Sequence, residues 1–440
     1  MLFRSKRFMP ARSLGEWLEY IERIHPKSIE LGLERVAKVR EALGGSSPAA
    51  VFTVAGTNGK GSTCAMLEAI LLAAGYKVGL YTSPHLLRYN ERVRLNGAPV
   101  SDARLCEAFE AVERARGDIQ LTYFEFGTLA AWVIFSGEAL DAAILEVGLG
   151  GRLDAVNIFD CDCALLTSVA LDHMDYLGNT RESIGAEKAG IFRPGKPAIV
   201  SDPDPPGSVH ERASATGADL RLIGRDFGYR RQEQQWMFWG PLGRRSGLAY
   251  PALRGERQLA NASAALAALD ALHLRLPVGM QDIRSGLAQV ELPARFQVLP
   301  GRPVVVLDVA HNPQAAAVLA ENLADMGFYP QTHAVFGMLR DKDISGVCRA
   351  VKGRISDWFA AGLSVPRGAS AQALADAIAG AGAQGEVSCF DNPREAYAAA
   401  TKRANENDRI VVFGSFHTVA EVMQAIEAAR TAVRGVRQGC

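Results

Sequence analysis

One glycine-rich segment, TVAGTNGKGST at residues 53–63, constrains the fold more than any other part of this sequence. It follows a continuous apolar run at 49–55 and leads into 62–75, where apolar residues recur at the i, i+4 spacing of a helix. A buried strand, a glycine-rich turn and a helix in this order are the setting of a phosphate-binding loop. The pattern therefore predicts a parallel α/β sheet that binds a nucleotide phosphate at the start of the helix.

This loop departs from the usual G-x-x-x-x-G-K-[S/T] pattern in two places. Gly56 lies only three residues before Gly59, and Lys60 is followed by Gly61 instead of a hydroxyl residue. A simple βα turn needs one or two glycines, whereas this segment adds a lysine, a serine and a threonine at the start of a helix. Phosphate binding is therefore favoured over a purely structural turn.

Length and composition exclude several classes of protein. A chain of 440 residues is too long for one hydrophobic core, which predicts two domains or at most three. The 48 basic residues balance the 48 acidic ones, so no net charge attracts nucleic acid. Seven scattered cysteines fit neither a disulfide framework nor a zinc ribbon. No signal peptide and no membrane-spanning run is evident, and we expect a cytoplasmic protein without membrane or nucleic-acid partners.

Two further apolar runs, at 141–151 and 163–175, end in polar residues. The carboxyl ends of parallel strands face the ligand crevice, so Glu146, Asp172 and His173 should approach the glycine-rich loop. Glu146 is favoured as a Mg²⁺ ligand because glycines follow it. For His173, spacing alone leaves a metal ligand and a polar core residue equally open.

Lys188 belongs to ESIGAEKAGIFRPGK, a segment with helical periodicity. Beside Glu187 it has the pattern of a solvated charged position. The residues alone assign it no chemistry.

A second α/β series follows the proline- and glycine-containing segment 292–303, which is typical of a domain seam. It predicts strands in VVVLDVA, HAVFGM, SDWFAAG and RIVVFGSF and helices around 313–325, 370–380 and 393–405. This alternation indicates a second, smaller doubly wound domain. Residues 202–256 lack clear periodicity, and we expect a loop and an antiparallel hairpin there.

Ten segments in this chain together carry a specific resemblance. They are AGTNGKGST (55–63), YTSPHLLRYNERVRLNG (81–97), LTYFEFGTLAA (121–131), ILEVGLGGRLDAVN (144–157), TSVALDHMDYLG (167–178), ESIGAEKAGIFRPG (182–195), LANASAALAAL (259–269), LPARFQ (292–297), LDVAHNP (307–313) and VVFGSFHTV (411–419). In this order the chain resembles the Mur ligase superfamily and, within it, the folylpolyglutamate synthase/dihydrofolate synthase enzymes. The unusual loop is the form that this family itself uses.

The resemblance implies an α/β fold of two domains. Residues 1–297 would form a P-loop-containing, Mur-ligase-like ATP-binding domain, and residues 298–440 a smaller Rossmann-like, doubly wound ligase domain. The implied reaction is ATP-dependent ligation of L-glutamate to the carboxylate of dihydropteroate or a folate through an acyl phosphate. ATP, L-glutamate, dihydropteroate and folates would be the partners of a monomer, and two Mg²⁺ ions and ATP its cofactors.

The resemblance also assigns roles to individual residues. The nucleotide set is Thr57, Asn58, Gly59, Lys60, Gly61, Ser62, Asn261, Arg295 and Asp308, with Arg295 on phosphate and Asp308 on the ribose. The metal set is Ser83, Glu146, His173 and Lys188, the last as a carbamate that supplies an anionic oxygen. The pteridine set is Thr122, Tyr123, Phe124, Glu125, Leu153, Asp154 and Ala155. His311 and Ser415 would face the incoming glutamate, and Lys60, Lys188 and His311 would act in catalysis.

Three alternatives stay open. A ligase that adds amino acids to a UDP-muramoyl precursor shares the loop, but it carries an extra N-terminal domain of ~100 residues, and only about fifty residues precede the loop here. A regulatory nucleotide-binding module would not need the magnesium set. A monofunctional folylpolyglutamate synthase would use the same motifs, although LTYFEFGTLAA and GRLDA favour both activities by resemblance.

Overall fold

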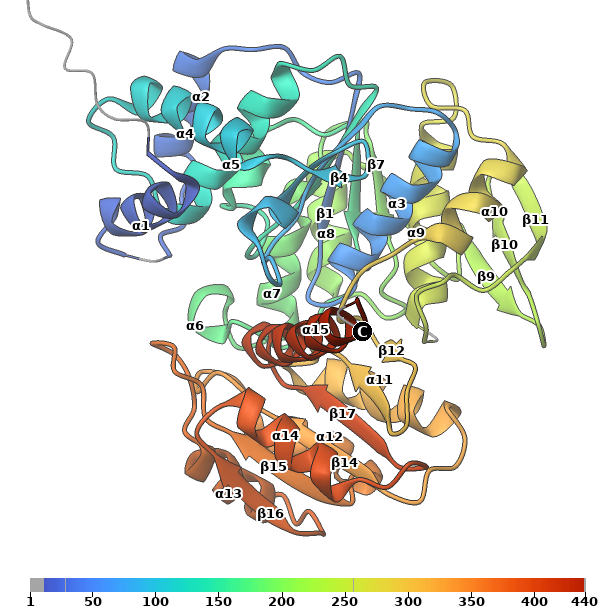
Figure 1. The fold of residues 1–440 in the computed structure, drawn as a ribbon. Coiled ribbons are helices and arrows are strands. Elements are labelled where there is room, and N and C mark those ends of the chain that lie inside the picture. Colours follow the sequence, from blue (N-terminus) through green and yellow to red (C-terminus); the bar gives the residue numbers. More distant parts are fainter. Residues whose placement is uncertain (1–11, 28, 256, 439–440) are drawn as a thin grey trace, which may run out of the picture.

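The computed structural model describes residues 12–27, 29–255 and 257–438, with side chains up to residue 431. The chain forms two α/β bodies, one above the other in Figure 1, that meet around α11 and the start of α15. This arrangement is the expected mixed α/β fold with a smaller C-terminal α/β unit. The basic N-terminal segment at 1–11 and Cys440 lie outside the described residues.

The larger body is built on an eight-stranded sheet in the order β4-β3-β2-β5-β1-β6-β7-β8. Its strands are β1 (Ala50–Ala55), β2 (Val78–Tyr81), β3 (Val93–Leu95), β4 (Ala98–Pro99), β5 (Ala142–Glu146), β6 (Cys163–Leu166), β7 (Pro197–Val200) and β8 (Asp219–Leu222). β1 pairs in parallel with β5 and β6, and only β3 runs in the opposite direction, antiparallel to its neighbours β2 and β4. β1, β5 and β6 are buried along their whole length, which explains why their sequences are continuously apolar.

Helices cover both faces of this sheet. They are α1 (Leu14–Ile24), α2 (Glu34–Leu43), α3 (Lys60–Ala73), α4 (Asp102–Arg116), α5 (Tyr123–Ser136), α6 (Met174–Leu177), α7 (Arg181–Lys188), α8 (Gly207–Thr216), α9 (Arg257–Ala271) and α10 (Met280–Gln289). One core contains Val51 of β1 with side chains of α1, α2, α4, α5, α7 and α8, and the other contains Phe52 with side chains of α3, α9 and α10. Neighbouring residues of one strand thus enter opposite cores, as the pleat requires.

The segment at 202–256 differs from its prediction. The hairpin is present, because β10 (Trp236–Gly240) pairs antiparallel with β11 (Gly243–Leu248) and with β9 (Gly228–Arg231). Its first part, however, contains α8 and β8 instead of a loop. α8 buries only Val209 and Ala213, so its sequence shows little apolar periodicity. Packing against the main sheet determines this part of the fold.

The smaller body contains a six-stranded sheet in the order β12-β13-β17-β14-β15-β16. Its elements are β12 (Gln297–Leu299), β13 (Val304–Leu307), α11 (Pro313–Asp325), β14 (Thr332–Phe336), α12 (Ile344–Val351), β15 (Asp357–Ala361), α13 (Ala371–Gly380), β16 (Val387–Phe390), α14 (Pro393–Arg403), β17 (Arg409–Phe413) and α15 (Phe416–Gln438). β12, β16, α12 and α15 were not anticipated. Because β12 begins at Gln297, the expected division after residue 297 falls within this strand.

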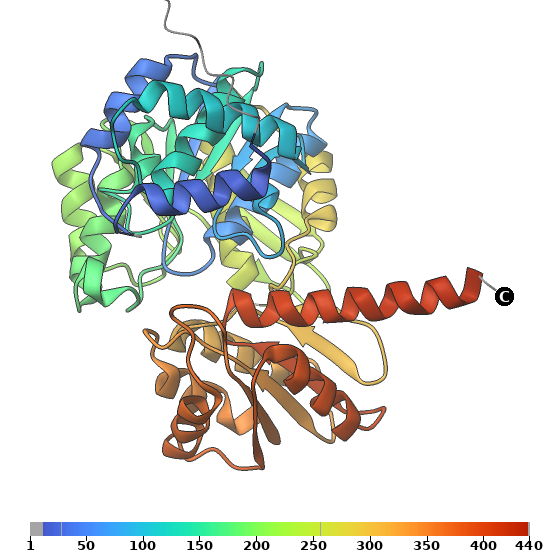
Figure 2. The ribbon, with the colours of Figure 1, turned by 60° about the vertical axis from the view of Figure 1, so that its left-hand side comes forward.

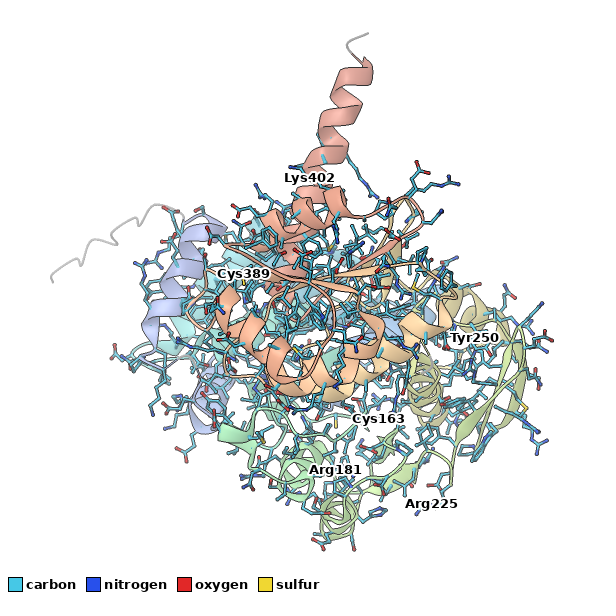
Figure 3. All side chains as sticks on the ribbon, turned by 90° about the horizontal axis from the view of Figure 1, so that it is seen from below. Cys163, Arg181, Arg225, Tyr250, Cys389 and Lys402 are labelled. Carbon is cyan, nitrogen blue, oxygen red and sulfur yellow. The ribbon has the colours of Figure 1, made fainter. Side chains whose placement is uncertain are left out.

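Helix α15 begins at the seam and projects well beyond the body of the molecule (Figures 2 and 3). Cys163 is buried and Cys389 is exposed, and the six cysteines among the described residues are all free. The C-x-C pair at 161 and 163 therefore consists of buried thiols, as expected. Within the described ranges, no helix combines the length and the apolar character that crossing a membrane requires.

Candidate active site

A cavity of about 540 Å³ lies between the two bodies, where the carboxyl ends of β1, β5 and β6 face α11 and the start of α15. All expected site residues except Tyr123 and Ser415 line it. The ligand crevice thus lies at the edge of the sheet that the strand-end residues indicated.

The glycine-rich loop joins β1 to α3 at the floor of this cavity. Gly59 is the N-cap of α3 with φ of 90°, and a Cβ on Gly56 would lie 1.9 Å from the Thr167 Oγ1. Both glycines are therefore required by the backbone path. The Lys60 ammonium donates to the carbonyl oxygens of Gly56 at 3.0 Å and Thr57 at 3.2 Å. The first turn of α3 thus presents its N–H groups and a lysine to the cavity, which suits a phosphate.

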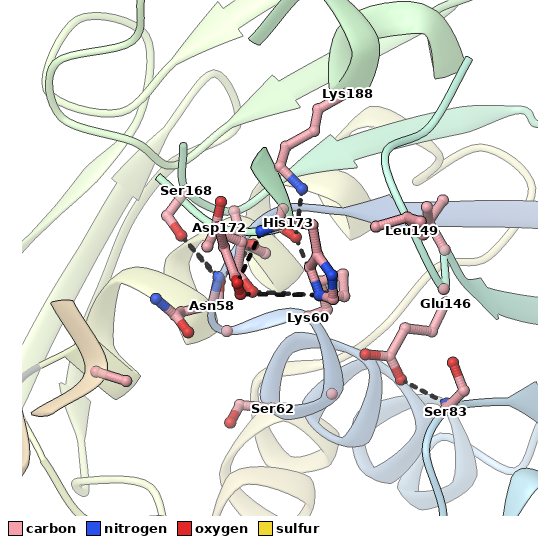
Figure 4. A pocket seen from close by; sticks show the side chains of 18 of the residues that line it. Asn58, Lys60, Ser62, Ser83, Glu146, Leu149, Ser168, Asp172, His173 and Lys188 are labelled. Atoms are coloured by element: carbon pink, nitrogen blue, oxygen red, sulfur yellow. Dashed lines mark hydrogen bonds and ion pairs between the residues drawn. The ribbon is translucent and has the colours of Figure 1, made fainter. Parts of the chain in front are cut away.

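Lys188, at the end of α7, is only 5% exposed. The solvated position that helical periodicity indicated is therefore wrong. Its Nζ donates to the Gly56 carbonyl at 3.0 Å, the same oxygen that accepts from Lys60 (Figure 4). Burial, together with the charge of Lys60, lowers the pKa of Lys188 to about 7. No carboxylate of the described chain forms an ion pair with this amine, so its environment favours the uncharged form.

Glu146 ends β5 and is 4% exposed. Its Oε2 accepts the Ser83 N–H at 3.1 Å, and burial raises its pKa. A buried carboxylate beside a serine hydroxyl provides the hard oxygen donors that Mg²⁺ prefers. In Figure 4, Glu146 and Ser83 lie side by side, and Lys188 and His173 lie apart from this pair. In the described part of the chain, no three His, Cys, Asp or Glu side chains form a ready-made metal site.

His173 follows β6 and adopts φ of 51°, a left-handed conformation that is uncommon for a residue with a side chain. Burial lowers its pKa to about 4. The neighbouring Asp172 accepts the Lys342 Nζ at 2.6 Å, and the His311 Nε2 lies 3.7 Å from this carboxylate. Burial alone would raise the pKa of Asp172, but these cationic and hydrogen-bonding partners hold it well below its ordinary value. Two residues of the smaller body thus approach Asp172, in the loop that follows β6.

The nucleotide residues expected at the seam also approach one another. Arg295 is within electrostatic range of both Asp308 and Glu146, and its guanidinium lies 5.1 Å from the centre of the Phe416 ring. Asp308 accepts the N–H groups of Phe296 at 2.7 Å and Ala310 at 2.8 Å. Burial raises the pKa of Asp308 and lowers that of Arg295. These two groups line the cavity from the side of the smaller body.

Asn58 and Asn261 flank the glycine-rich loop. The Asn58 Nδ2 donates to Asn312 at 3.2 Å and to Gln314 at 2.7 Å, and Asn58 accepts from the Asn312 Nδ2 at 3.1 Å. Its side chain therefore joins the two bodies. A Cβ on Gly59 would lie 2.6 Å from the Asn261 Oδ1, so this asparagine packs directly on the loop.

The expected pteridine residues, Tyr123 excepted, line the same cavity from the larger body. Thr122 caps α5. The Glu125 carboxylate accepts the backbone N–H of Thr122 at 2.8 Å and the Nη2 of Arg35 at 3.1 Å. A Cβ on Gly148 would lie 2.5 Å from the Phe124 ring, so this glycine admits the ring. Asp154 accepts the N–H groups of Leu149 and Val156, yet burial raises its pKa to about 7.

Tyr123 and Ser415 do not line the cavity, in contrast to the sequence prediction. Tyr123 follows the cap of α5 and packs edge-on against Tyr89, with their ring centres 5.9 Å apart. Ser415 precedes α15, where its Oγ accepts the Thr418 N–H at 3.1 Å and shares a 2.8 Å hydrogen bond with the Thr418 hydroxyl. Each side chain is held by a local structural contact.

Several polar residues that line or contact the site were not predicted from the sequence, among them Lys342, Gln314 and Arg92. Lys342 lies in a loop of the smaller body that carried no interpretable pattern. Gln314 directly follows LDVAHNP, so its motif gave a usable signal. Arg92 lies within the YTSPHLLRYNERVRLNG segment, 9% exposed, with its Nε donating to the His85 Nδ1 at 2.9 Å.

Comparison with known proteins places this architecture in a family. The model of the Mur ligase middle domain matches residues 54–269, and that of the Mur ligase glutamate ligase domain matches 294–416. A dihydrofolate synthase/folylpolyglutamate synthase of Escherichia coli is 48% identical over 422 residues, which are 96% of this chain and 97% of that protein.

Solved structures agree with these sequence matches. The structure of E. coli FolC in complex with DHPP and ADP has a TM-score of 0.91 and 48% identity, and the match covers 96% of this chain and all of that one (100%). A bifunctional folylpolyglutamate synthase/dihydrofolate synthase with Mn, AMPPNP and L-glutamate bound has a TM-score of 0.87 and 47% identity over 94% of this chain and 98% of that one. This chain therefore belongs to the Mur ligase superfamily, in the dihydrofolate synthase/folylpolyglutamate synthase family.

Proposed function

We propose that this protein uses ATP to join L-glutamate to the carboxylate of dihydropteroate and of folates. The observation that carries the proposal is the shared cavity, which the phosphate loop with Lys60 lines together with Arg295 and His311. Each of the three reactants is an anion, so a site for them must gather cations and helix N-termini from several elements. The relatives with this architecture include proteins solved with ADP, DHPP and L-glutamate.

The reaction is activation followed by amide formation. A carboxylate oxygen of the pteroate or folate attacks the γ-phosphorus, and the bond from this phosphorus to the β,γ-bridging oxygen breaks to release ADP. The glutamate nitrogen then attacks the acyl carbon, phosphate leaves with its acyl oxygen, and the amine loses a proton. Without activation a carboxylate is too poor an electrophile for this attack.

Lys60 and the first turn of α3 would bind the β- and γ-phosphates and stabilise the charge that develops on them. Arg295 would approach the same phosphates from the seam. A divalent cation held by Glu146 and Ser83 would add positive charge beside these oxygens.

His311 lines the cavity, and we propose that it contacts the incoming glutamate. Its Nδ1 lies 2.9 Å from the Val309 carbonyl, which can only accept, so Nδ1 carries the hydrogen and Nε2 faces Asp172. We assign to His311 the role of orienting the glutamate amine near the acyl carbon. Closure of the seam through Asn58, Asn312 and Gln314 would keep water from the acyl phosphate.

The carbamate of Lys188 belongs to this proposal. An uncharged amine reacts with CO₂ to give an anionic carbamate and a proton, and burial of Lys188 without a carboxylate partner in the described chain favours the uncharged form. The product would present oxygen donors on the side of His173. Incubation with ¹³C-bicarbonate should give a carbamate carbon signal by NMR that is absent from Lys188→Met, and equal spectra would refute the modification.

The similar proteins favour a chain with both the dihydrofolate synthase and the folylpolyglutamate synthase activity over one with the second activity alone. Five proteins named as dihydrofolate synthase/folylpolyglutamate synthase are 36–48% identical to this chain, whereas a folylpolyglutamate synthase of Lacticaseibacillus casei is 33% identical. We also propose that the chain acts as a cytoplasmic monomer divided into two domains near residue 297.

ADP release tests the proposal. The protein is incubated with ATP, Mg²⁺ and L-glutamate and with dihydropteroate, tetrahydrofolate or a UDP-muramoyl peptide precursor as acceptor. We expect turnover with both pteridines and none with the UDP precursor. Turnover with one pteridine would reduce the proposal to that half-reaction, and turnover with the UDP precursor alone would overturn it. A regulatory module would release ADP with no acceptor-dependent increase.

A further inference from the structure

Arg92 is a buried arginine without a role in the proposed reaction. It ends the short 3₁₀ helix η1 (Tyr89–Arg92), is 9% exposed and lines the cavity. Its Nε donates to the His85 Nδ1 at 2.9 Å. Within the described ranges, the structure records no ion pair for this side chain and no hydrogen bond from its Nη1 and Nη2 groups. A buried cation without a counter-charge costs free energy, so these groups indicate an anionic ligand in the cavity.

The backbone places Arg92 beside the expected metal ligands of the larger body. The Thr82 N–H donates to the Arg92 carbonyl at 2.9 Å, so Arg92 lies opposite the residue that precedes Ser83. Arg92 is also within electrostatic range of Glu146, whose Oε2 accepts the Ser83 N–H at 3.1 Å. A substrate carboxylate bound at Glu146 and Ser83 through a metal ion would therefore approach the Arg92 guanidinium.

Aromatic rings hold this guanidinium in place. The Arg92 Cζ lies 5.3 Å from the centre of the Tyr89 ring and 5.5 Å from that of Tyr123. A guanidinium that lies over aromatic rings keeps its N–H edge available for planar, bidentate binding of a carboxylate. Tyr123, which does not line the cavity, thus supports a residue that does.

The acid next to Arg92 in the sequence does not neutralise it. The Glu91 carboxylate accepts three backbone N–H groups at 2.6–2.8 Å, those of Leu86, Leu87 and Arg88. These bonds involve both carboxylate oxygens and fix the loop that precedes η1. The positive charge of Arg92 is therefore left for a ligand.

Arg295, and not Arg92, is the arginine beside the phosphate loop. A Cβ on Gly61 would lie 3.9 Å from the Arg295 Nη2 and 3.9 Å from the Glu146 Oε1. Arg92 instead contacts Tyr123 of α5, the helix whose first turn carries expected pteridine residues. The anion that suits Arg92 therefore belongs to the acceptor and not to the nucleotide.

We propose that Arg92 binds the α-carboxylate of the terminal glutamyl residue of a folate acceptor. A short saturated chain joins this group to the γ-carboxylate that reacts, so when the γ-carboxylate lies at Glu146 and Ser83 the α-carboxylate would lie towards Arg92. Dihydropteroate carries a single carboxylate and has no group for this contact. Arg92 would thus select acceptors for extension of the glutamyl tail. This inference rests on the proposed function and assigns a specificity residue to one of its two reactions.

The test compares three acceptors in ligation by the full-length protein: dihydropteroate, tetrahydrofolate, and the tetrahydrofolate analogue in which 4-aminobutyrate replaces glutamate. The analogue keeps the reacting carboxylate and lacks only the α-carboxylate. We expect Arg92→Leu to raise the KM for tetrahydrofolate at least about tenfold, because a charge-assisted bidentate contact is lost. The KM values for the analogue and for dihydropteroate should rise much less.

Two further variants control for charge and for folding. Arg92→Lys keeps the positive charge without the bidentate geometry and should give a KM for tetrahydrofolate between those of the wild type and Arg92→Leu. Arg114→Leu removes an exposed arginine of α4 and should match the wild type with every acceptor.

Three outcomes would overturn this role of Arg92. One is an unchanged KM for tetrahydrofolate in Arg92→Leu. Another is an equal rise for tetrahydrofolate and the analogue, which indicates a general defect of the site. The third is a rise in the KM for L-glutamate with dihydropteroate as acceptor, which would assign Arg92 to the incoming amino acid. A wild-type protein that ligates none of the three acceptors would instead refute the proposed function.

Discussion

Replacement of Lys188 by alanine separates a chemical role of this residue from a structural one. The side chain makes one hydrogen bond, from Nζ to the Gly56 carbonyl at 3.0 Å, and Lys60 donates to the same oxygen. The loss of this bond costs about 1 kcal/mol, and the removal of a buried amine offsets part of that cost. The truncated side chain opens onto the cavity, so no closed void forms. We expect a change in unfolding free energy below about 2 kcal/mol.

The effect on catalysis should be much larger. Loss of a group that merely orients a metal ligand costs roughly 10–100-fold in activity, so loss of an anionic ligand should cost more than about 100-fold. The assay measures ligation and urea unfolding of Lys188→Ala, with Lys402→Ala, an exposed lysine of α14, as the matched control. We expect the control to match the wild type in both measurements.

Small molecules identify the charge that the site requires. If Lys188 acts as an anionic carbamate, acetate or formate should restore part of the ligation rate of Lys188→Ala. Restoration by methylamine alone would show that an ammonium is needed and would refute the reasoning. An undiminished rate without any addition would exclude a chemical role altogether.

Three further predictions follow from individual contacts. Glu146→Gln removes the buried carboxylate beside Ser83. This variant should lose Mg²⁺-dependent ligation while it still binds tripolyphosphate. Unchanged Mg²⁺ dependence would contradict the role of Glu146 as a metal ligand. Asn58→Ala removes three hydrogen bonds across the seam, each worth about 1 kcal/mol. This variant should have a higher KM for ATP and a larger radius of gyration measured by X-ray scattering. An unchanged KM and radius would contradict the role of Asn58 in joining the two bodies. Burial raises the pKa of Asp154 from 3.8 to about 7, so the folded state binds the carboxyl proton of Asp154 more tightly than the unfolded state does. The free energy of unfolding should therefore decrease as the pH rises from 4 to 7. The urea midpoint of the wild type should therefore fall relative to that of Asp154→Asn over this range, and parallel profiles would show that Asp154 does not titrate there.

The parts of the fold that could be predicted are those in which burial and sequence agree. β1, β5 and β6 are covered on both faces, so their apolar runs reveal them, and polar residues at their ends reveal the ligand crevice. α8 and β8 gave no such signal, because few of their residues enter the core. Their positions depend on packing against elements distant in sequence.

The site shows the same limit. Periodicity placed Lys188 on a solvated face, and only the packing of α7 against the phosphate loop buries it. Lys342 contacts Asp172 at 2.6 Å across 170 residues of sequence, a juxtaposition that no local pattern encodes. Ser415 and Tyr123 show a further limit, because a motif match does not distinguish a residue that lines a cavity from a neighbour that caps or supports the helix.

The most direct test of the account is isotope transfer from the acceptor to phosphate. Dihydropteroate labelled with ¹⁸O in its carboxylate is incubated with ATP, Mg²⁺ and L-glutamate, and the released phosphate is analysed by ³¹P NMR. Activation through an acyl phosphate predicts one labelled oxygen in each phosphate and a product that is heavier by one glutamyl residue. Turnover that releases unlabelled phosphate, or that yields AMP and pyrophosphate, would contradict activation through an acyl phosphate.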